Sequence, residues 1–410
     1  MKSDRFKVER DASLDFVGEA YATLFPNLHR YPATMIPQLG VELLARFDLQ
    51  EGSLLDPYCG SGSSFAAAIN AGFKSLRGND LNPLAVLISK AKFTRVPKAT
   101  LLRGFDEIRA AVSSLPKGRV KPSEVPNVTN VDFWFPTDSI PVLARLKGLV
   151  DKLEHSGVKN LALLALSETI RDVSYTRKNE FKLYRMPAEK MATFQPDTKK
   201  IFLAHLERIE SRYVAHYLPR LDGVRIRLVD KAFETGKELV DVVLTSPPYG
   251  DSGTTVAYGQ FSCLTNEWLG IDDARQVDNR LMGGRRTPHL LSEGVLASQV
   301  QQIAEMFPKR ALEVSSFYFD LRASITQVAA AVAAGGLAIY IVGNRRVKDV
   351  QLQTDQFIAE EFEAAGFKHL ITYERALSSK SMPLVNSPSN KAGVVRGTMT
   401  QEFIVICQRS

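Results

Sequence analysis

The chain has 410 residues, of which 45% are hydrophobic and 24% are charged, and its formal charge is +7 with a pI near 9.1. This composition excludes a disordered chain and allows a full apolar core, while the basic charge is compatible with a polyanionic partner. Cys59, Cys263 and Cys407 form no CxxC pair, so neither a disulfide framework nor a zinc site is indicated, and we expect no bound metal.

No segment of the sequence is typical of a membrane protein. The N-terminal stretch MKSDRFKVERDASLDF carries charges throughout, and no later stretch offers about 18 uncharged apolar residues in a row. The alanine-rich segment 323–343 comes nearest, but Gly335 and Gly336 divide it into a helix and a strand. We therefore expect a cytoplasmic protein.

Two successive strand-turn-helix units lie between residues 52 and 93. Residues 52–73, GSLLDPYCGSGSSFAAAINAGF, predict a strand that ends at Asp56, a glycine-rich turn, and a helix over 63–71 closed by Gly72. Residues 75–93 repeat the scheme, with a strand that ends at Asp80 and a helix that begins near Pro83. Such units indicate a parallel sheet with helical crossovers.

Helical patterns interrupted by prolines follow from about residue 94 to 221, and the strand pattern then returns. We expect strands at 224–230, 239–246, 335–344, 368–375 and 402–408, with helices at 315–334 and 354–367. The expected architecture is α/β and Rossmann-like, with about seven mostly parallel strands and helices on both faces.

In such a sheet, ligands bind beyond the carboxyl ends of the strands. Gly60 and Gly62 allow a tight turn before a helix N-terminus, and Asp80 stands where nucleotide-binding units place a carboxylate for ribose hydroxyls. A Walker-type GxxxxGK[ST] motif is absent, and Phe65 replaces the third glycine of GxGxxG. These features favour a nucleoside ligand with little phosphate, such as S-adenosylmethionine. An acidic turn at Asp56 would tolerate the positive charge of its sulfonium group.

The segments LLDPYCGSGS, NDLNPLAV, VLTSPPYG and HRYPATMIPQL together resemble the amino-group (cytosine-N4 or adenine-N6) DNA methyltransferases, over roughly 25–95 and 222–410. The resemblance implies the methyltransferase fold with S-adenosylmethionine as cofactor. It assigns cofactor contacts to Tyr31, Pro32, Ala33, Asp56, Tyr58, Cys59, Gly60, Ser61, Gly62, Ser63, Asp80, Leu81, Asn82, Asp230 and Thr245.

The tetrad Ser246, Pro247, Pro248 and Tyr249 is the expected catalytic motif. An exocyclic amine is a poor nucleophile because its lone pair is delocalised, and acceptors at Ser246 Oγ and the Pro247 carbonyl would localise that pair. The prolines fix φ, Tyr249 could stack on the base, and the base must be flipped out of the duplex. In the family, serine at the first position goes most often with cytosine N4, and no cysteine nucleophile is needed.

Two basic segments are candidates for binding double-stranded DNA. Residues 171–190 hold six Lys or Arg against three Asp or Glu, interleaved with aromatic residues, although a solvated helix face has a similar pattern. The second candidate is 279–289, near a flexible glycine pair, and weaker candidates lie in 250–270, where packing explains the residues equally well. The proposed DNA contacts are Arg177, Lys178, Lys182, Arg185, Arg285, Arg286, Tyr258 and Gln260.

We therefore divide the chain into a catalytic domain (1–95 and 222–410), a helical insertion as candidate DNA-recognition region (96–221), and a second, irregular insertion near the active site (251–315). The predicted function is cytosine-N4 methylation of DNA, as in restriction–modification systems, with a possible cognate restriction endonuclease. Adenine-N6 methylation, guanine-N2 methylation of RNA and an inactive nucleic-acid-binding subunit remain alternatives. The recognition sequence and oligomeric state are open.

Overall fold

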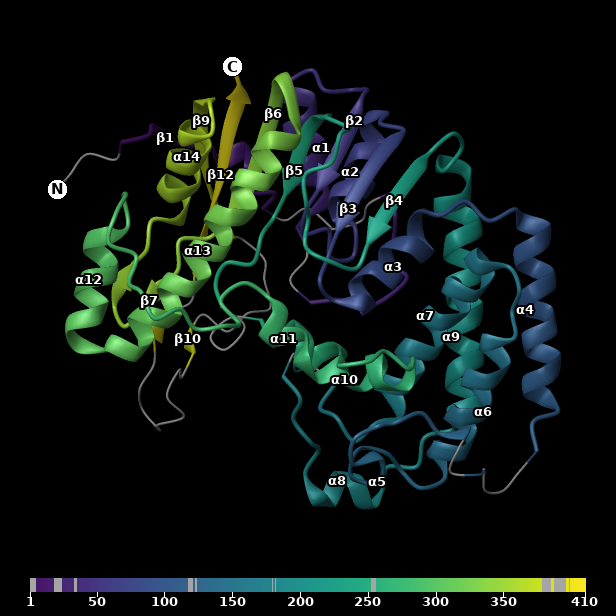
Figure 1. Cartoon of the computed structure of the whole chain (residues 1–410). Coiled ribbons are helices and arrows are strands. Elements are labelled where there is room, and N and C mark those ends of the chain that lie inside the picture. The colour runs from purple at the N-terminus through teal and green to yellow at the C-terminus, as the bar shows by residue number, and fades with distance from the viewer. Residues whose placement is uncertain are drawn as a thin grey trace.

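The computed structural model describes residues 5–17, 24–32, 35–116, 121, 124–178, 180, 182–251, 256–377, 385–386, 396–397 and 399–410. One sheet organises the chain (Figure 1). Its strands are β1 (Val8–Arg10), β2 (Ser53–Asp56), β3 (Ser75–Asn79), β4 (Arg225–Val229), β5 (Val240–Thr245), β6 (Val332–Val342), β9 (Phe367–Ala376) and β12 (Gln401–Arg409). Two short pairs lie outside it: β7 (Arg346–Val347) with β8 (Val350–Gln351), and β10 (Val385–Asn386) with β11 (Arg396–Gly397).

The strands of the sheet follow the order β1-β9-β12-β6-β5-β2-β3-β4. The run from β6 through β5, β2 and β3 to β4 is parallel, and β1 pairs in parallel with β9. Only β12 runs against its two neighbours, β6 and β9. This mixed, mostly parallel sheet confirms the predicted α/β class and contains one strand, β1, that the sequence did not reveal.

Alternate residues of the central strands enter two separate cores, one on each face of the sheet. Leu54, Val242 and Ile339 join the core beneath α1 (Pro37–Arg46), α2 (Ser63–Ala71) and α3 (Pro83–Phe93). Their neighbours Leu55 and Val243 join the core beneath α12 (Ala297–Met306), α13 (Pro308–Ala331) and α14 (Thr354–Ala364). The period-2 alternation of a strand buried on both faces therefore produces a three-layer fold.

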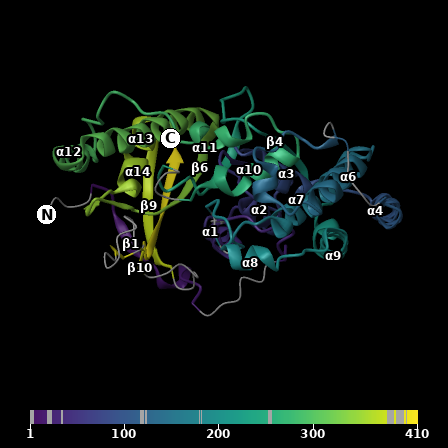
Figure 2. The ribbon, with the colours of Figure 1, turned by 90° about the horizontal axis from the view of Figure 1, so that it is seen from below.

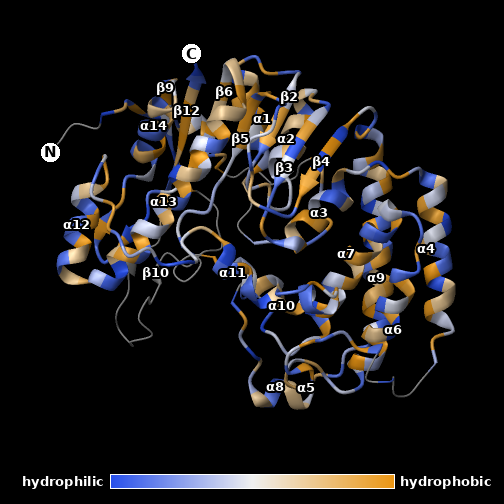
Figure 3. Ribbon diagram, viewed as in Figure 1, coloured by the Kyte–Doolittle hydropathy of each residue, from blue (hydrophilic) through white to orange (hydrophobic). Residues whose placement is uncertain are grey.

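The insertion forms a helical unit, defined here as residues 98–212. It contains α4 (Lys98–Ser113), α5 (Val131–Trp134), α6 (Ser139–Asp151), α7 (Ser156–Val173), α8 (Ala188–Ala192) and α9 (Thr198–Arg212). Buried residues of this unit, such as Phe105, Leu164 and Phe202, belong to the same apolar core as α1 to α3. Figures 1 and 2 place the unit beside α3, away from β9 and β12. Figure 3 shows its helices striped with hydrophobic and hydrophilic residues, as amphipathic helices require.

The segment 251–315 is less irregular than predicted, because it contains α10 (Tyr258–Trp268), α11 (Val277–Arg280) and α12 as well as the start of α13. Helix α13 begins at Pro308, earlier than the expected 315, and β6 begins at Val332. The pairing of β5 with β6 shifts register between Val240 and Val242, and Gly335 takes φ +74°. A bulge thus absorbs the glycine pair inside the strand.

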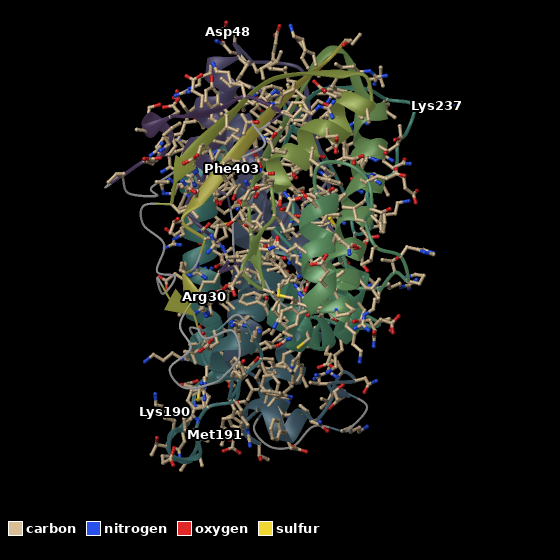
Figure 4. The ribbon with its side chains drawn as sticks, turned by 90° about the vertical axis from the view of Figure 1, so that its left-hand side faces the viewer. Arg30, Asp48, Lys190, Met191, Lys237 and Phe403 are labelled. Atoms are coloured by element: carbon tan, nitrogen blue, oxygen red, sulfur yellow. The ribbon has the colours of Figure 1, made fainter. Side chains whose placement is uncertain are left out.

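The parallel strands point their carboxyl ends towards α10 and α11 (Figure 1). Asp48 precedes β2 and Lys237 precedes β5, and both lie at the opposite end of the molecule from Lys190 and Met191 of α8 (Figure 4). Among the residues that the structure describes, no helix is both long and apolar enough to cross a membrane. Within that same part of the chain, no group of three or more His, Cys, Asp or Glu could hold a metal ion.

Candidate active site

A cavity of about 610 Å³ opens at the carboxyl ends of β2, β3, β4 and β5. Its walls come from the turns after these strands, from α10 and the segment 279–285, and from one face of α13. The lining includes most of the predicted cofactor residues: Tyr31, Asp56, Tyr58, Cys59, Gly60, Ser61, Ser63, Asp80, Leu81 and Asn82. This volume falls within the range of small-molecule sites.

Asp56 ends β2 and is fixed by hydrogen bonds from three donors. The backbone N–H of Tyr58 donates to Oδ1 over 3.0 Å, and the hydroxyls of Thr245 and Ser64 donate to Oδ1 and Oδ2 over 2.5 Å each. Burial raises the pKa of Asp56 to about 6, although these donors oppose the rise. Thr245 is fully buried and does not line the cavity; it acts on Asp56 from behind.

The glycine-rich turn leads directly into α2. Gly62 is the N-cap of that helix at φ +81°, and a Cβ there would lie 2.5 Å from the Phe93 ring. Behind the turn, Ser89 Oγ donates to the Gly60 carbonyl over 2.8 Å, and the buried Lys92 Nζ donates to the Ser61 carbonyl over 2.7 Å. The turn is therefore held rigidly, with the unpaired N–H groups of α2 beside the cavity.

Asp80 follows β3 and faces the cavity from the neighbouring turn. Its Oδ2 accepts from the Gly60 N–H over 2.9 Å and its Oδ1 from the Asn82 N–H over 2.8 Å. Burial raises its pKa to about 6. Because only one lone pair of each oxygen is used by these contacts, the carboxylate can accept further hydrogen bonds from a ligand, such as those from two ribose hydroxyls.

Two tyrosines form a wall next to Asp80. The rings of Tyr31 and Tyr258 stack with centroids 5.9 Å apart, and Asn82 Nδ2 donates to Tyr31 Oη over 3.1 Å. Tyr258, which the sequence suggested for DNA contact, thus lies on the side of the cavity expected to hold the cofactor. Pro32 is buried outside the cavity lining, and Ala33 lies outside the described residues.

Asp230 does not take the place predicted for it. It follows β4 with an exposed side chain and is not part of the cavity lining. The next three residues, Lys231, Ala232 and Phe233, line the cavity instead. The chain leaves the strand at Val229 and turns inward only after Asp230, so the apolar contact at this wall comes from Phe233.

The predicted catalytic tetrad follows β5 and borders the same cavity. Ser246 and Pro248 line it, whereas Pro247 is buried outside the lining. Tyr249 is half-buried, and its hydroxyl donates to Glu402 Oε1 over 2.9 Å. Gly250 is closed in by Arg345, because a Cβ there would lie 2.0 Å from Arg345 Nη1.

The buried Asp251 anchors the chain just after the tetrad. Arg310 Nη2 and Arg345 Nη1 both donate to its Oδ2, over 2.8 and 2.9 Å. Burial works against the charged form, but the two guanidinium groups lower the pKa of Asp251 to about 2. This network fixes the chain that leaves the tetrad.

The basic segment of the insertion forms a hairpin, defined by its described residues 174–178, 180 and 182–186, with an antiparallel bridge between Thr176 and Arg185. Arg185 lies 4.0 Å over the ring of Phe133, which is 46% exposed. Among the described residues, no acidic side chain forms an ion pair with the four basic residues predicted to bind DNA here: Arg177, Lys178, Lys182 and Arg185. The basic hairpin therefore presents cations that are not neutralised locally.

The basic hairpin contacts α10, which also borders the cavity. Gln260 Oε1 accepts from the Leu183 N–H of the hairpin over 3.3 Å, and Arg171 of the preceding helix α7 lies 3.9 Å over the Phe261 ring. Gln260 itself is exposed. Of the two arginines predicted to bind DNA in the second basic segment, Arg285 lines the cavity and is exposed, while Arg286 pairs with Glu313 over 2.8 Å.

One wall of the cavity escaped the sequence analysis. It is a face of α13 that carries Asp320, Ala323, Ser324 and Gln327, with Ser324 Oγ accepting from Tyr58 Oη over 2.6 Å. Their i, i+3, i+4, i+7 spacing is a signal that could have been found, since it marks one face of a helix otherwise rich in apolar residues.

The sheet order, the acidic turns and the adjoining tetrad are together the architecture of an S-adenosylmethionine-dependent methyltransferase. No protein-family model matches the chain. The Type II methyltransferase M.MvaI of Kocuria varians is 35% identical to this chain in an alignment 422 residues long. The alignment covers 96% of this chain and 93% of that protein. The chain belongs to the Type II methyltransferases, and its methyl donor is S-adenosylmethionine.

Solved structures give weaker similarities. A protein described as a modification subunit of a type I restriction enzyme, from Vibrio vulnificus YJ016, aligns with TM-score 0.31 and 12% identity over 94% of this chain and 46% of that one. The rRNA methyltransferase aviRa of Streptomyces viridochromogenes aligns with TM-score 0.29 and 13% identity over 99% of this chain and 96% of that one. Scores this low do not establish a common fold.

Proposed function

We propose that this chain transfers a methyl group from S-adenosylmethionine to the exocyclic N4 amine of a cytosine that is flipped out of duplex DNA. The observation that carries the proposal is that Ser246 and Pro248 border the same cavity as Asp56 and Asp80. The site for the methyl acceptor therefore adjoins the site for the donor. The similarity to M.MvaI, a Type II methyltransferase, supports a role in a restriction–modification system with a cognate endonuclease as partner.

The cavity fits the cofactor by the chemistry of its donors and acceptors. Asp80 would accept hydrogen bonds from the ribose hydroxyls, the N–H groups at the start of α2 would face the methionine carboxylate, and Asp56 would favour the nearby cationic sulfonium. Tyr31 and Phe233 supply apolar contact for the adenine ring. When bound, S-adenosylmethionine supplies a methyl group on a good leaving group.

The tetrad would prepare the amine for a direct displacement. Ser246 Oγ and the Pro247 carbonyl accept the two N–H groups, which moves the nitrogen towards tetrahedral geometry and localises its lone pair. With the cofactor bound, the nitrogen would bond to its methyl carbon, the electrons of the carbon–sulfur bond would pass to sulfur, and the nitrogen would lose one proton to solvent. Fixed acceptors cost no reorganisation at the moment of reaction.

This chemistry needs no cysteine nucleophile, and neither Cys59 of the cavity lining nor the buried Cys263 of α10 is suited to that role. Burial raises the pKa of Cys59 well above its ordinary value and that of Cys263 to about 11. A thiol must ionise to attack a base, so both side chains remain inert near neutral pH. Serine as the first tetrad residue favours cytosine over adenine, following the family resemblance.

The DNA would be bound on the basic hairpin and the segment around Arg285. The basic hairpin places Arg185 over the exposed ring of Phe133 and Arg177 over that of Tyr184, and its predicted DNA contacts form no ion pair within the described residues. Cations beside exposed aromatic rings suit phosphates and unstacked bases. Through α10 it is joined to the wall formed by Tyr258. A duplex held there would place a flipped base near the tetrad.

Transfer of radiolabel from methyl-labelled S-adenosylmethionine tests the proposal. We expect label in duplex DNA, none in RNA of matched sequence, and at least a hundredfold loss of rate for Ser246→Ala. Label in RNA alone would contradict the DNA substrate, and an unchanged rate for Ser246→Ala would contradict the acceptor role of the tetrad.

A further inference from the structure

A continuous chain of hydrogen bonds leads from the tetrad into the core of the sheet. Ser246 Oγ donates to Tyr249 Oη over 3.3 Å, and Tyr249 Oη donates to Glu402 Oε1 over 2.9 Å. Arg375 donates to the other carboxylate oxygen, Glu402 Oε2, through Nε over 2.9 Å and through Nη2 over 2.5 Å. The cofactor assignments and the resemblance to the family involve neither Glu402 nor Arg375.

The inner end of this chain is rigid. Glu402 and Arg375 are direct partners across the antiparallel pairing of β12 with β9, and their side chains are 5% and 1% exposed. Arg375 Nη1 also donates to the Leu14 carbonyl over 3.0 Å. A buried ion pair with both partners satisfied holds its geometry, so the position of Glu402 Oε1 is fixed by the sheet.

The number of protons determines the direction of each hydrogen bond. A carboxylate paired with a guanidinium has only lone pairs to offer, so the single proton of the Tyr249 hydroxyl points to Glu402. Tyr249 Oη then presents a lone pair to Ser246, and the single proton of the Ser246 hydroxyl points to Tyr249. The remaining lone pairs of Ser246 Oγ are left for the cavity.

We propose that Tyr249 and Glu402 are positioning residues that hold Ser246 as a hydrogen-bond acceptor towards the target base. This inference rests on the proposed function, in which the target group is an exocyclic amine. A serine hydroxyl that rotates freely can donate to a carbonyl or accept from an amine. Held by this chain, it accepts only, so the site distinguishes the amine of cytosine from the carbonyl oxygen of thymine or uracil at the same ring position.

The discrimination has a simple physical origin. A carbonyl oxygen opposite the lone pairs of Ser246 would place two acceptors in contact without a proton between them. The amine of cytosine meets the same lone pairs with an N–H. The hydrogen-bond chain therefore adds to both the choice of base and the activation of the amine.

Tyr249→Phe tests this proposal because it removes one hydroxyl and keeps the ring. We expect kcat to fall about tenfold, the worth of one hydrogen bond, while the Kd for S-adenosylmethionine stays unchanged. The second readout is the ratio of the Kd values for two duplexes that carry either cytosine or uracil at the target position. The wild-type preference for cytosine should shrink about tenfold in Tyr249→Phe, since the freed Ser246 hydroxyl can then donate to uracil.

Tyr217→Phe is the matched control, because it also removes one buried tyrosine hydroxyl, which donates to the Pro26 carbonyl over 2.8 Å. It should keep both kcat and the base preference. Glu402→Gln, with thermal unfolding followed alongside, should shift the base preference in the same direction as Tyr249→Phe.

The inference is overturned if the wild-type protein methylates cytosine and Tyr249→Phe has the same kcat and the same preference for cytosine over uracil. If the wild-type protein methylates no DNA at all, the proposed function is overturned instead, so the two failures are distinguishable. If the product is N6-methyladenine, the same comparison made with adenine and hypoxanthine decides the inference.

Discussion

Replacing Asp80 by asparagine isolates the carboxylate that we assign to the ribose. In the folded protein Asp80 accepts one backbone N–H on each oxygen, from Gly60 over 2.9 Å and from Asn82 over 2.8 Å. An asparagine can satisfy only one of these donors, because its amide nitrogen would face the other. One hydrogen bond within the turn is therefore lost, but the substitution also removes the buried charge whose desolvation raises the pKa of Asp80 to about 6. The free energy of unfolding should therefore fall by less than the roughly 1.5–3 kcal/mol of one charge-assisted hydrogen bond.

The same substitution removes an acceptor for the ribose hydroxyls. The loss of one charge-assisted hydrogen bond to the ligand corresponds to a roughly 10- to 150-fold higher Kd for S-adenosylmethionine. Isothermal titration calorimetry gives that constant, and urea unfolding gives the change in stability. Asp230→Asn is the matched control, since Asp230 is exposed and lies outside the cavity lining.

Two results would refute this reasoning. If Asp80→Asn binds the cofactor as tightly as wild type does, the ribose is held elsewhere. Asp230→Asn could instead weaken binding as strongly as Asp80→Asn, which would restore the cofactor contact that the sequence predicted for Asp230.

Three further predictions concern the charges around the site. Glu168→Gln should lower the free energy of unfolding, measured by urea denaturation, by about 2–4 kcal/mol. The reason is that the buried Glu168 accepts hydrogen bonds from both the backbone N–H and the Nε of Arg30. An unchanged urea midpoint would be inconsistent with this prediction. The Kd for S-adenosylmethionine should rise as the pH falls through about 6, because Asp56 and Asp80 take up protons there. The rise should be up to about tenfold per pH unit for each proton taken up. A Kd that stays constant between pH 5 and 8 would contradict this prediction. If Arg177 contacts one phosphate, Arg177→Ala should make the plot of the logarithm of the DNA-binding constant against the logarithm of the salt concentration less steep by about 0.9. The same slope as wild type would show that the basic hairpin is not part of the DNA interface.

The sign of the pH effect separates loss of binding from unfolding. Both aspartates have folded pKa values of about 6, above the 3.8 of an ordinary aspartate. Their contribution to stability is therefore fully present below pH 3.8 and is lost as the pH rises through about 6. Weaker cofactor binding at pH 5 thus accompanies a gain in stability from these two groups.

Local chemistry explains why the two opening units could be predicted to within a residue. Gly72 is the C-cap of α2 at φ +111°, Asn82 caps α3 through the N–H of Leu84, and Pro83 is the first residue of α3. Each of these signals lies within a few residues of the boundary that it sets. The acidic residues at the ends of β2 and β3 could be placed for the same reason.

Long-range geometry was not readable from the sequence. Strand β1 has three residues, and its partner residues Thr372 to Glu374 lie far along the chain, so no local pattern marks it. The inward turn after Asp230 and the burial of Glu402 against Arg375 depend likewise on tertiary packing. The SPPY sequence could be recognised as a candidate motif, whereas the hydrogen bonds that join Ser246, Tyr249 and Glu402 could not be predicted from it.

The identity of the methylated base tests the central claim most directly. Duplex DNA methylated by the wild-type chain would be digested to nucleosides and analysed by mass spectrometry, with DNA treated by Ser246→Ala as the reference. Our account predicts N4-methylcytosine from wild type and none above background from Ser246→Ala. N6-methyladenine as the sole product, or no modified nucleoside from wild type, would contradict it.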